Sequence, residues 1–347
     1  MKALLLSKYR NLEITDLPVP QPGPEEVLIR VAACGICGSD VHGYDGSTGR
    51  RIPPIVMGHE AAGVVAALGD AVESLSVGDH VTFDSTVYCG ACDFCRRGQV
   101  NLCDQRQVLG VSCGDYRRAG AFADYVLVPA RITYRLPDNF SFPEAAMLEA
   151  ISVALHAVAL TDVRTEDTVV VIGAGMIGLL IAQSLRVAGC ARVIVADVDQ
   201  SRLALARQLG ITETVCVGGA EAAARILEHT GANGADATIE AVGTSDTVNL
   251  AIDSVRKGGR VTLVGNISPT ATLPLQKVVA RQILLQGSCA SAGEYPRAIE
   301  LVASGAIQVK PLITAVAPLT EGPAWFERLH AREPNLMKIV LTPGAVS

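Results

Sequence analysis

The chain has 347 residues, of which 49% are hydrophobic and 18% charged, and it contains 33 glycines and 17 prolines. This balance excludes a disordered tail protein and a coiled coil, and the length predicts two domains. The formal net charge of −6 makes the chain a poor binder of nucleic acid or of an anionic membrane. The longest apolar runs, such as 169–182, are broken by glycines and are too short to span a membrane.

The first eleven residues, MKALLLSKYRN, contain a short apolar run but lack the long hydrophobic region and the cleavage site of a secretory signal. We therefore expect a cytoplasmic protein. The ten cysteines are not spread evenly, because four of them crowd into residues 89–103. In a reducing compartment such a cluster indicates a metal site rather than disulfides.

Residues 1 to about 150 are rich in short strand-like runs. Apolar or alternating stretches lie at 27–33, 62–68, 80–83 and 125–128, and turns with proline and glycine separate them. This pattern predicts a β-rich domain, either a barrel or a sandwich.

From about residue 152 strands and helices alternate. Apolar strands are predicted at 168–172, 192–196, 213–217, 235–240, 260–264 and 283–287, and helices at 176–188, 200–209, 219–229 and 245–256. This alternation predicts an α/β fold with a parallel, doubly wound sheet. After about residue 292 we expect two further helices, 296–304 and 325–332, and a last strand, 337–341.

The stretch VIGAGMIG contains the motif GxGxxG after a predicted strand and at the start of a predicted helix. In this context the motif indicates a dinucleotide site. Gly173 would allow the tight turn, Gly175 the close approach of a pyrophosphate, and Gly178 the packing of helix on strand. The pyrophosphate would lie on the positive N-terminus of the helix, which places Met176 and Ile177 in the same site.

Asp197 ends the second predicted strand of this domain. A carboxylate there can accept hydrogen bonds from both ribose hydroxyls and would repel a 2′-phosphate, so the sequence predicts NAD rather than NADP. Arg202 is a candidate for the adenine pocket, although a solvated helical arginine would look the same in sequence. The alternative for the whole motif is a glycine turn in an α/β domain that binds no ligand.

Cys89, Cys92, Cys95 and Cys103 follow one another at spacings that can wrap one tetrahedral ion. Four thiolates satisfy zinc and leave no open position, so we expect a structural zinc site. The spacing alone leaves an iron–sulfur cluster open, although nothing else in the sequence indicates electron transfer.

A second set of metal-binding residue types comes from separate segments. Cys37 begins CGSDVH, His59 and Glu60 are adjacent in GHEAAG, and Glu149 follows AAML. Both glutamates lie in apolar surroundings, where a carboxylate needs a partner or a metal. Together these residues can form an open zinc site with a position left for water or substrate. Taken singly, each is more ordinary as a packed histidine or a surface charge.

These motifs together resemble the zinc-dependent medium-chain dehydrogenase/reductase superfamily, in its polyol (sorbitol-type) dehydrogenase branch. The resemblance covers essentially the whole chain and rests on CGICGSDVH, GHEAAG, VGDHV, the four-cysteine run, LEAISVALHA and VIGAGMIGLL. It implies a GroES-like zinc-containing catalytic domain at 1–151 and 292–347, and a Rossmann NAD-binding domain at 152–291. One departure is Ala150, because the polyol branch often has proline at this position.

The resemblance also implies residue roles. The catalytic zinc would be held by Cys37, His59, Glu60 and Glu149. Either glutamate could ligate directly or through water. Ser39 would begin a proton relay that His42 continues towards solvent, and Glu60 would belong to the same catalytic group. The chain would thus use NAD and two zinc ions, one catalytic and one structural.

The implied reaction is reversible NAD-linked oxidation of a secondary alcohol of a polyol or sugar-derived substrate to a ketone. Glu149 favours polyols, because alcohol dehydrogenases have cysteine and threonine dehydrogenases often aspartate at this ligand position. Arg117 and Arg118 would suit a phosphorylated polyol, although such a pair is more often solvated. The alternatives are amino-alcohol oxidation of the L-threonine 3-dehydrogenase type and a non-catalytic NAD- or redox-sensing scaffold.

The resemblance further implies a homo-oligomer, either a tetramer or a dimer. The dinucleotide-binding sheets would pair edge to edge through the strand near 260–265 and the apolar segment 267–275 that follows it.

Overall fold

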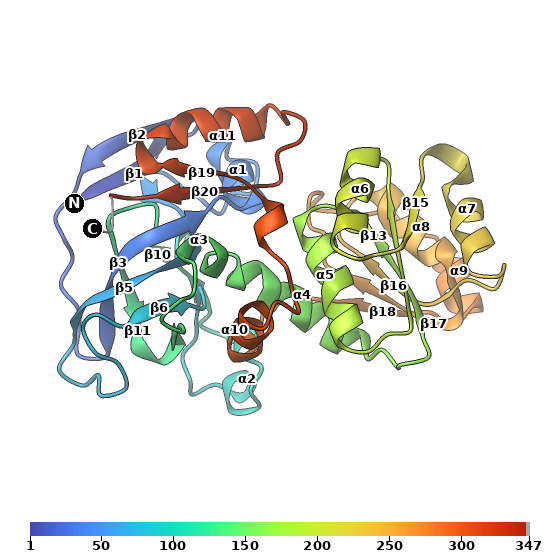
Figure 1. Ribbon diagram of the computed structural model, residues 1–347, viewed down its shortest axis with the longest axis horizontal. Helices are drawn as coiled ribbons and strands as arrows, with labels where there is room; N and C mark the ends of the chain where they lie inside the picture. Colours follow the sequence, from blue (N-terminus) through green and yellow to red (C-terminus); the bar gives the residue numbers. More distant parts are fainter. Residues whose placement is uncertain (345–347) are drawn as a thin grey trace. The chain divides into compact units, whose positions relative to one another are not determined.

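The computed structural model describes residues 1–344, and these form two compact units. The first unit comprises Met1–Glu149, Tyr295–Ala303 and the described part of Leu312–Ser347. The second comprises Ala150–Glu294 and Ser304–Pro311. Figure 1 labels the helices and strands of both units.

The first unit is built mainly from strands. Its largest sheet follows the order β12-β6-β5-β3-β20-β19, and β11 also pairs with β3. These strands are β3 (Glu26–Gly35), β5 (Glu60–Leu68), β6 (His80–Phe83), β11 (Tyr125–Pro129), β12 (Thr133–Arg135), β19 (Ile313–Pro318) and β20 (Lys338–Thr342). A smaller sheet consists of β1 (Lys2–Lys8), β2 (Asn11–Asp16) and β4 (Ile55–Val56), and two short ladders consist of β7 (Thr86–Val87) with β8 (Gln107–Val108) and β9 (Val111–Ser112) with β10 (Arg117–Arg118).

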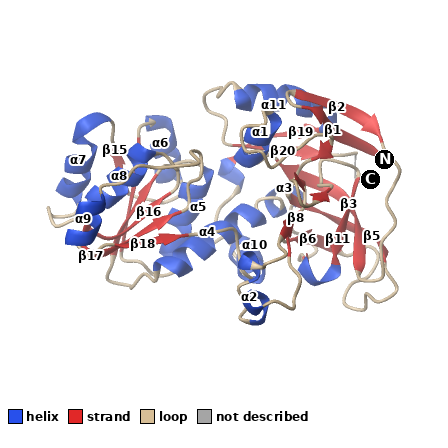
Figure 2. Cartoon of the chain, turned by 180° about the vertical axis from the view of Figure 1, so that it is seen from behind, coloured by secondary structure: helices blue, strands red, loops and turns tan. Residues whose placement is uncertain are grey.

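Short helices surround these strands. They are α1 (Gly38–Tyr44), α2 (Asp93–Arg96), α3 (Phe142–Ala145), α10 (Tyr295–Ala303) and α11 (Gly322–His330). Figure 2 shows α1 and α11 near each other. They pack through Tyr44, whose ring centroid lies 5.8 Å from that of Phe326 and 5.9 Å from that of His330. The core beneath them is apolar and includes Leu4 and Phe122.

The second unit is a parallel sheet in the order β15-β14-β13-β16-β17-β18. Its strands are β13 (Thr168–Ile172), β14 (Arg192–Asp197), β15 (Glu213–Cys216), β16 (Ala235–Glu240), β17 (Val255–Leu263) and β18 (Leu284–Gly287). The strand order reverses at β13, and in such sheets ligands bind beyond the carboxyl ends of the strands at this switch.

Helices cover both faces of this sheet. They are α5 (Met176–Val187), α6 (Gln200–Gln208), α7 (Ala222–His229), α8 (Ser245–Ser254) and α9 (Leu275–Ala280). A further helix, α4 (Leu148–Thr161), has its first two residues in the first unit and the rest in the second. In Figure 1, α5 and α6 lie on one face of the sheet, while α7 lies on the other. Residues of α7 and α8, for example Ile226 and Ile252, belong to one buried apolar cluster with strand residues such as Val170. The predicted α/β fold with a parallel, doubly wound sheet is therefore confirmed.

One predicted strand differs in its bounds and its place. β17 begins at Val255 rather than at residue 260, because Val255 already pairs with Ala235 before the register shifts. β17 also lies between β16 and β18, so both of its edges are occupied. The expectation that this strand forms an edge-to-edge interface is wrong, and the free edge on that side is β18.

Two other features are absent from the sequence-based prediction. The hairpin of β1 and β2 was not predicted. Phe142–Thr161 is one helical stretch that is long and apolar enough to cross a membrane by length and composition. From the sequence, the segment weighed as a possible membrane span was 169–182. About two thirds of the apolar window of Phe142–Thr161, 67%, is buried in the structure, as is the case for a core helix.

Candidate metal centres and dinucleotide loop

Three of the predicted ligands of the catalytic zinc meet in the first unit. One ligand atom from each of Cys37, His59 and Glu60 lies within 4.8 Å of the others. Cys37 is the N-cap of α1, where the backbone is extended, and Glu60 is the first residue of β5. A thiolate, an imidazole and a carboxylate are residue types that hold zinc in an open site. The donor set therefore fits this ion.

A buried carboxylate lies behind His59. Oδ1 of Asp40 is 3.3 Å from Nδ1 of His59, and Oδ2 accepts a hydrogen bond from the amide of Cys37 over 3.3 Å. Burial opposes ionisation of Asp40, but His59 and Arg51 outweigh it and lower the pKa of this carboxyl to about 2. Burial likewise opposes the charge on His59, and Asp40 outweighs it and raises the pKa of the imidazole well above its ordinary value. A carboxylate in this place orients a metal-binding imidazole, and metal binding would release the proton of His59.

Glu60 pairs with a buried lysine. Nζ of Lys338 donates to Oε2 of Glu60, and it donates to the carbonyl oxygen of Ile36 over 3.1 Å. Both charged side chains are 1% exposed. Burial opposes the charge on Lys338, but Glu60 outweighs it, so the pKa of the lysine is raised. The second carboxylate oxygen, Oε1, is buried and has no hydrogen-bond partner among the described residues, which leaves it available to a cation.

The sheet register explains how this pair forms. β3 pairs with β5 on one side and with β20 on the other, and Gly35 ends β3 opposite Glu60. A Cβ atom at position 35 would lie 2.5 Å from Oε2 of Glu60 and 3.4 Å from Cδ of Lys338. Glycine therefore leaves the space in which the two charged side chains meet.

Glu149 stands apart from the three clustered ligands. It lies in the first turn of α4 and is partly buried, and it is not a member of the group within 4.8 Å. Burial, together with the charges of Glu60 and Asp84, raises its pKa to about 7 despite the opposing effect of His59. The structure thus places Glu149 in the electrostatic surroundings of the site and leaves its predicted role as a ligand as a prediction.

Ser39 and His42 both lie on α1, three residues apart. Ser39 is exposed, and its Oγ accepts a hydrogen bond from Nη2 of Arg51 over 3.3 Å. His42 lies in the last turn of the helix, and its backbone carbonyl accepts from the hydroxyl of Ser47 over 2.9 Å. Residues three apart on a helix share a face, so the two predicted relay groups lie on one side of α1.

The four-cysteine lobe also brings its ligands together. The Sγ atoms of Cys89, Cys92, Cys95 and Cys103 lie within 4.8 Å of one another. Backbone amides point at these sulfurs, since those of Ala91 and Cys92 donate to Cys89 over 3.4 and 3.3 Å. These amides lower the pKa of Cys89 to about 6. Amide donors favour the thiolate, which is the form that binds zinc, so the lobe fits a closed zinc site.

The three glycines of the dinucleotide motif occupy three different environments. Gly173 has a φ of +100°, a conformation that favours glycine. A Cβ at Gly178 would lie 1.8 Å from the carbonyl oxygen of Gly173. A side chain at this position would therefore prevent the close approach of the helix to the strand. A Cβ at Gly175 would meet nothing within 4 Å, so the backbone is open on that side. Gly175 caps α5, whose first residues are Met176 and Ile177 and whose first amides have no partner within the helix.

Asp197 is buried at the carboxyl end of β14. Its Oδ2 accepts from the amide of Ala174 over 2.6 Å, and its Oδ1 accepts from the amide of Asp199 over 2.8 Å. The carboxylate is thereby held against the glycine loop. Arg202 is half exposed and lies 4.0 Å from Oδ2 of Asp197 and 3.8 Å from Asp199. It therefore lies beside the predicted ribose-binding carboxylate.

The arginine pair considered for a phosphate group already has partners. Nη1 of Arg117 donates to the carbonyl oxygen of Pro54, and Nε of Arg118 donates to Oε1 of Gln107 over 2.5 Å. These contacts hold the β9–β10 ladder to its neighbours and give each guanidinium group one partner within the protein.

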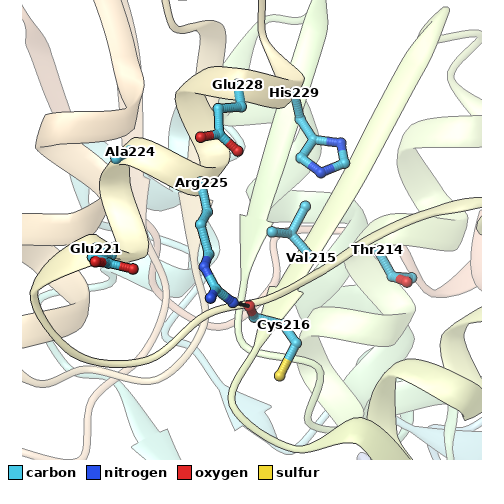
Figure 3. A pocket seen from close by; sticks show the side chains of 8 residues that line it. All are labelled: Thr214, Val215, Cys216, Glu221, Ala224, Arg225, Glu228 and His229. Carbon is cyan, nitrogen blue, oxygen red and sulfur yellow. Dashed lines mark hydrogen bonds between the residues drawn. The ribbon is translucent and has the colours of Figure 1, made fainter.

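A surface cavity of about 780 Å³ lies along the outer edge of the second unit's sheet, between β15 and α7. Figure 3 shows Arg225 reaching from α7 towards β15, where its Nη1 donates to the carbonyl oxygen of Cys216 over 3.2 Å. Glu221, Glu228 and His229 add polar groups to the wall. None of the predicted site residues lines this cavity, so it is separate from the candidate site.

Four residues of the site were not predicted from the sequence. They are Gly35, Asp40, Arg51 and Lys338. Asp40 lies inside the quoted motif CGSDVH, where a buried acid between a ligand cysteine and a histidine could have been noticed. Lys338 is the single charge in the apolar run MKIVL, and this was the available sign of a buried partner.

Comparison with known proteins agrees with this geometry. The family model described as the alcohol dehydrogenase GroES-like domain matches residues 23–138, and the model described as zinc-binding dehydrogenase matches residues 177–304. The chain is 34% identical to a sorbitol dehydrogenase of Bacillus subtilis over 99% of this chain and 98% of that protein. It is 36% identical to an L-idonate 5-dehydrogenase of Vitis vinifera over 90% of this chain and 86% of that protein.

Solved structures give the same result. An Escherichia coli oxidoreductase of unknown specificity, ECK1772, superposes with a TM-score of 0.93 at 32% identity, covering 99% of both chains. Galactitol-1-phosphate dehydrogenase of Escherichia coli superposes with a TM-score of 0.89 at 26% identity, covering 99% of this chain and 100% of that chain. The resemblance inferred from the motifs is confirmed, and with it an NAD-dependent, zinc-containing enzyme. The chain belongs to the zinc-dependent medium-chain dehydrogenase/reductase superfamily, in its polyol dehydrogenase branch.

Proposed function

We propose that the chain catalyses the reversible oxidation of a secondary hydroxyl group of a polyol or sugar-derived substrate to a ketone. The observation that carries the proposal is the carboxylate-rich surroundings of Cys37 and His59, formed by Glu60, Glu149 and the buried Asp40. Such a polar site suits a substrate with adjacent hydroxyl groups. Aromatic residues make up 4% of the chain, which disfavours a pocket for long alkyl alcohols.

The relatives' names support the same class of substrate. Besides sorbitol and L-idonate 5-dehydrogenases, they include a D-xylulose reductase A of Aspergillus oryzae that is 35% identical over 95% of this chain. The alternative of an amino-alcohol oxidation of the L-threonine type has no comparable support. A non-catalytic scaffold is disfavoured because the clustered ligand groups and the α1 residues are all present.

The chain's own residues would act on the substrate as follows. When bound by Cys37, His59 and a glutamate, zinc supplies a Lewis acid that makes the alcohol proton easier to lose, and NAD supplies the hydride acceptor. Ser39, exposed at the start of α1, takes the alcohol proton on Oγ while its own hydroxyl proton leaves. His42, one turn further along the helix, passes a proton to solvent. In the second unit, the loop at Gly175 and the Asp197 carboxylate hold the dinucleotide.

The test is an NAD-reduction assay with purified protein over sorbitol, xylitol, L-idonate, galactitol 1-phosphate, 2,3-butanediol, primary alcohols and L-threonine. We expect the highest catalytic efficiency with a compound that has adjacent secondary hydroxyls. Cys37→Ala and His59→Ala should abolish turnover while the far-ultraviolet circular dichroism stays unchanged. Turnover of L-threonine or primary alcohols with no activity on polyols would contradict the substrate class and leave the zinc and NAD assignments standing.

We also propose that the protein is a homo-oligomer, a tetramer or a dimer, that pairs through the edge strand β18. Among residues 1–344, β18 bonds to β17 and to no other strand, and its Leu284 is 55% exposed. Leu275 and Val279 on α9 are 65% and 71% exposed. A free strand edge beside apolar side chains is a site where chains associate. Leu284→Lys should lower the molar mass measured by sedimentation, whereas Val77→Lys, at a position elsewhere that is 65% exposed, should not.

We propose a cytoplasmic location as well. All ten cysteines are free of disulfides in the structure, and seven of them would have to stay reduced near metal sites or in the core.

A further inference from the structure

Arg51 is a buried arginine that contacts two consecutive residues of α1. Its side chain is 6% exposed. Nη2 donates to Oδ1 of Asp40 over 3.1 Å and to Oγ of Ser39 over 3.3 Å, and Nε lies 3.4 Å from the same Oδ1. Nη1 donates to the carbonyl oxygen of Arg50 over 3.2 Å. Every nitrogen of the guanidinium therefore has a partner, and two of the three partners lie beside the predicted ligand cysteine.

The fold makes room for this arginine. Ser39 and Gly43 are four residues apart and so lie on one face of α1. A Cβ at Gly43 would lie 2.1 Å from Cγ and 2.9 Å from Cβ of Arg51. The stem of Arg51 thus lies on the bare backbone at Gly43, and its head reaches the N-terminal turn at Ser39. A bridge between Arg51 and Ser112 holds the backbone of the arginine in this place.

The position has a chemical consequence for Ser39. A guanidinium only donates hydrogen bonds and keeps its charge at all working pH values. By donating to Oγ it occupies one lone pair of Ser39 and directs the hydroxyl proton away from itself, towards the exposed side. The adjacent positive charge also favours negative charge that develops on this oxygen during proton transfer.

The same guanidinium acts on the other side of the site. Oδ1 of Asp40 faces both Arg51 and Nδ1 of His59, at 3.1 and 3.3 Å. Arg51 therefore fixes the rotamer of Asp40 and shares the carboxylate oxygen that orients His59. Groups behind a metal-binding histidine change its affinity and activity by about 10- to 100-fold when they are altered.

We propose that Arg51 is a positioning residue for the proposed oxidation of a secondary hydroxyl group, and this inference rests on that proposed function. It holds the Ser39 hydroxyl in the orientation needed for proton transfer and holds Asp40 against His59. The alternative is that Arg51 only neutralises the buried Asp40. That role would require a positive charge but not the fork geometry that reaches both residues.

Arg51→Lys separates these roles, because lysine keeps the charge but cannot bond two partners in a fixed fork. In the absence of a chelator we expect the Arg51→Lys protein to carry zinc and to keep its melting temperature. Its kcat should fall by about 10- to 100-fold, and its KM for NAD and polyol should stay nearly unchanged. The solvent deuterium isotope effect on kcat should rise. Arg50→Lys, at the neighbouring exposed arginine, is the matched control and should behave like the wild type. Wild-type kcat in a folded, zinc-loaded Arg51→Lys protein would overturn the proposal.

A double variant tests the route through Ser39. In a Ser39→Ala background, Arg51→Lys should lower kcat much less than it does alone, because the oxygen it positions is already gone. If Arg51→Lys lowered kcat as much in the Ser39→Ala background as it does alone, the proposal that Arg51 positions Ser39 would be overturned.

Cobalt-substituted protein tests the contact with His59 without turnover. Arg51→Lys should shift the visible absorption of bound Co²⁺ and weaken its retention against a chelator, whereas Arg50→Lys should not. An unchanged visible absorption of Co²⁺ in Arg51→Lys would overturn the proposal that Arg51 holds Asp40 against His59. If the wild type oxidises no polyol, the proposed function fails, and the cobalt measurement still decides whether Arg51 acts on the metal site.

Discussion

The buried pair of Glu60 and Lys338 offers a quantitative test of how the first unit is held together. Lys338→Met keeps the length and the apolar stem of the side chain and removes only its charge. Glu60 would then keep a carboxylate that is 1% exposed, one oxygen of which already has no hydrogen-bond partner among the described residues. We expect a large loss of stability, because an isolated buried charge cannot be solvated.

The magnitude follows from the burial of both partners. Removing one member of a buried ion pair destabilises a protein by about 3–5 kcal/mol. For a unit of roughly 200 residues each kcal/mol shifts the melting temperature by about 2–4 °C. The unfolding midpoint of the first unit should therefore fall by about 6–20 °C. In the double variant Glu60→Gln, Lys338→Met both charges are absent, so most of this loss should be recovered.

The assay can follow the first unit alone. Trp325 is the only tryptophan of the chain and lies on α11 in that unit, so its fluorescence reports thermal unfolding there. Zinc content is measured for each variant, so that a loss of metal is separated from a loss of the pair. Lys2→Met, which removes an exposed partner of Asp16, is the control and should leave the midpoint unchanged. A midpoint for Lys338→Met within 3 °C of the wild type, or a double variant no more stable than the single one, would refute the reasoning.

Three further predictions concern separate parts of the chain. Asp197→Ser should raise the ratio of catalytic efficiencies for NADP over NAD, because the carboxylate that repels a 2′-phosphate is gone; an unchanged ratio in cofactor titrations would exclude this role. Cys92→Ala should lower the zinc content from two ions per chain to one and lower the melting temperature, and metal analysis showing two ions would exclude a zinc site in the lobe. Burial opposes ionisation of Asp236, but Arg256 outweighs it and lowers the pKa of this carboxyl. Its stabilising effect is thus present above the unfolded pKa of about 3.9 and is lost as pH falls through the lower folded value. Asp236→Asn should therefore be less stable than the wild type in urea at pH 7 and approach it only as the pH falls below the folded pKa of Asp236, while the exposed Glu228→Gln should match the wild type throughout.

The second unit was predictable because its local patterns agree with its long-range structure. β13 and β16 were predicted with the bounds that the structure has. β13 was recognisable because a buried parallel strand is a continuous apolar run. β17 was placed too late, because Arg256, Lys257 and two glycines follow its first residue and resemble a turn. That start is defined by pairing with Ala235, which is a contact and not a pattern.

The metal-binding groups were predictable to the extent that they lie in short motifs. Cys37, His59 and Glu60 were chosen from residue type and spacing, and the structure brings them together. Arg51 was not chosen, because its neighbours GRRIPP look like an exposed turn. Its placement depends on the bare backbone at Gly43, and no periodicity in the sequence indicates that a side chain will lie there.

Lys338 shows how much about a buried ion pair could have been inferred from the sequence. A single charge within the apolar run MKIVL must be buried with a counter-charge if the run is an interior strand. This requirement limits the partner to acidic residues in apolar surroundings, two of which are Glu60 and Glu149. Composition cannot choose between them, because both stretches are equally apolar. The choice is made by the antiparallel register, which pairs Gly35 of β3 with Val340 of β20 and with Glu60 of β5. Lys338, two residues before Val340, can therefore meet Glu60 beside Gly35. The local sequence thus indicates that Lys338 needs an acidic partner. Only the pairing of the strands identifies that partner as Glu60, which lies 278 residues away in the sequence.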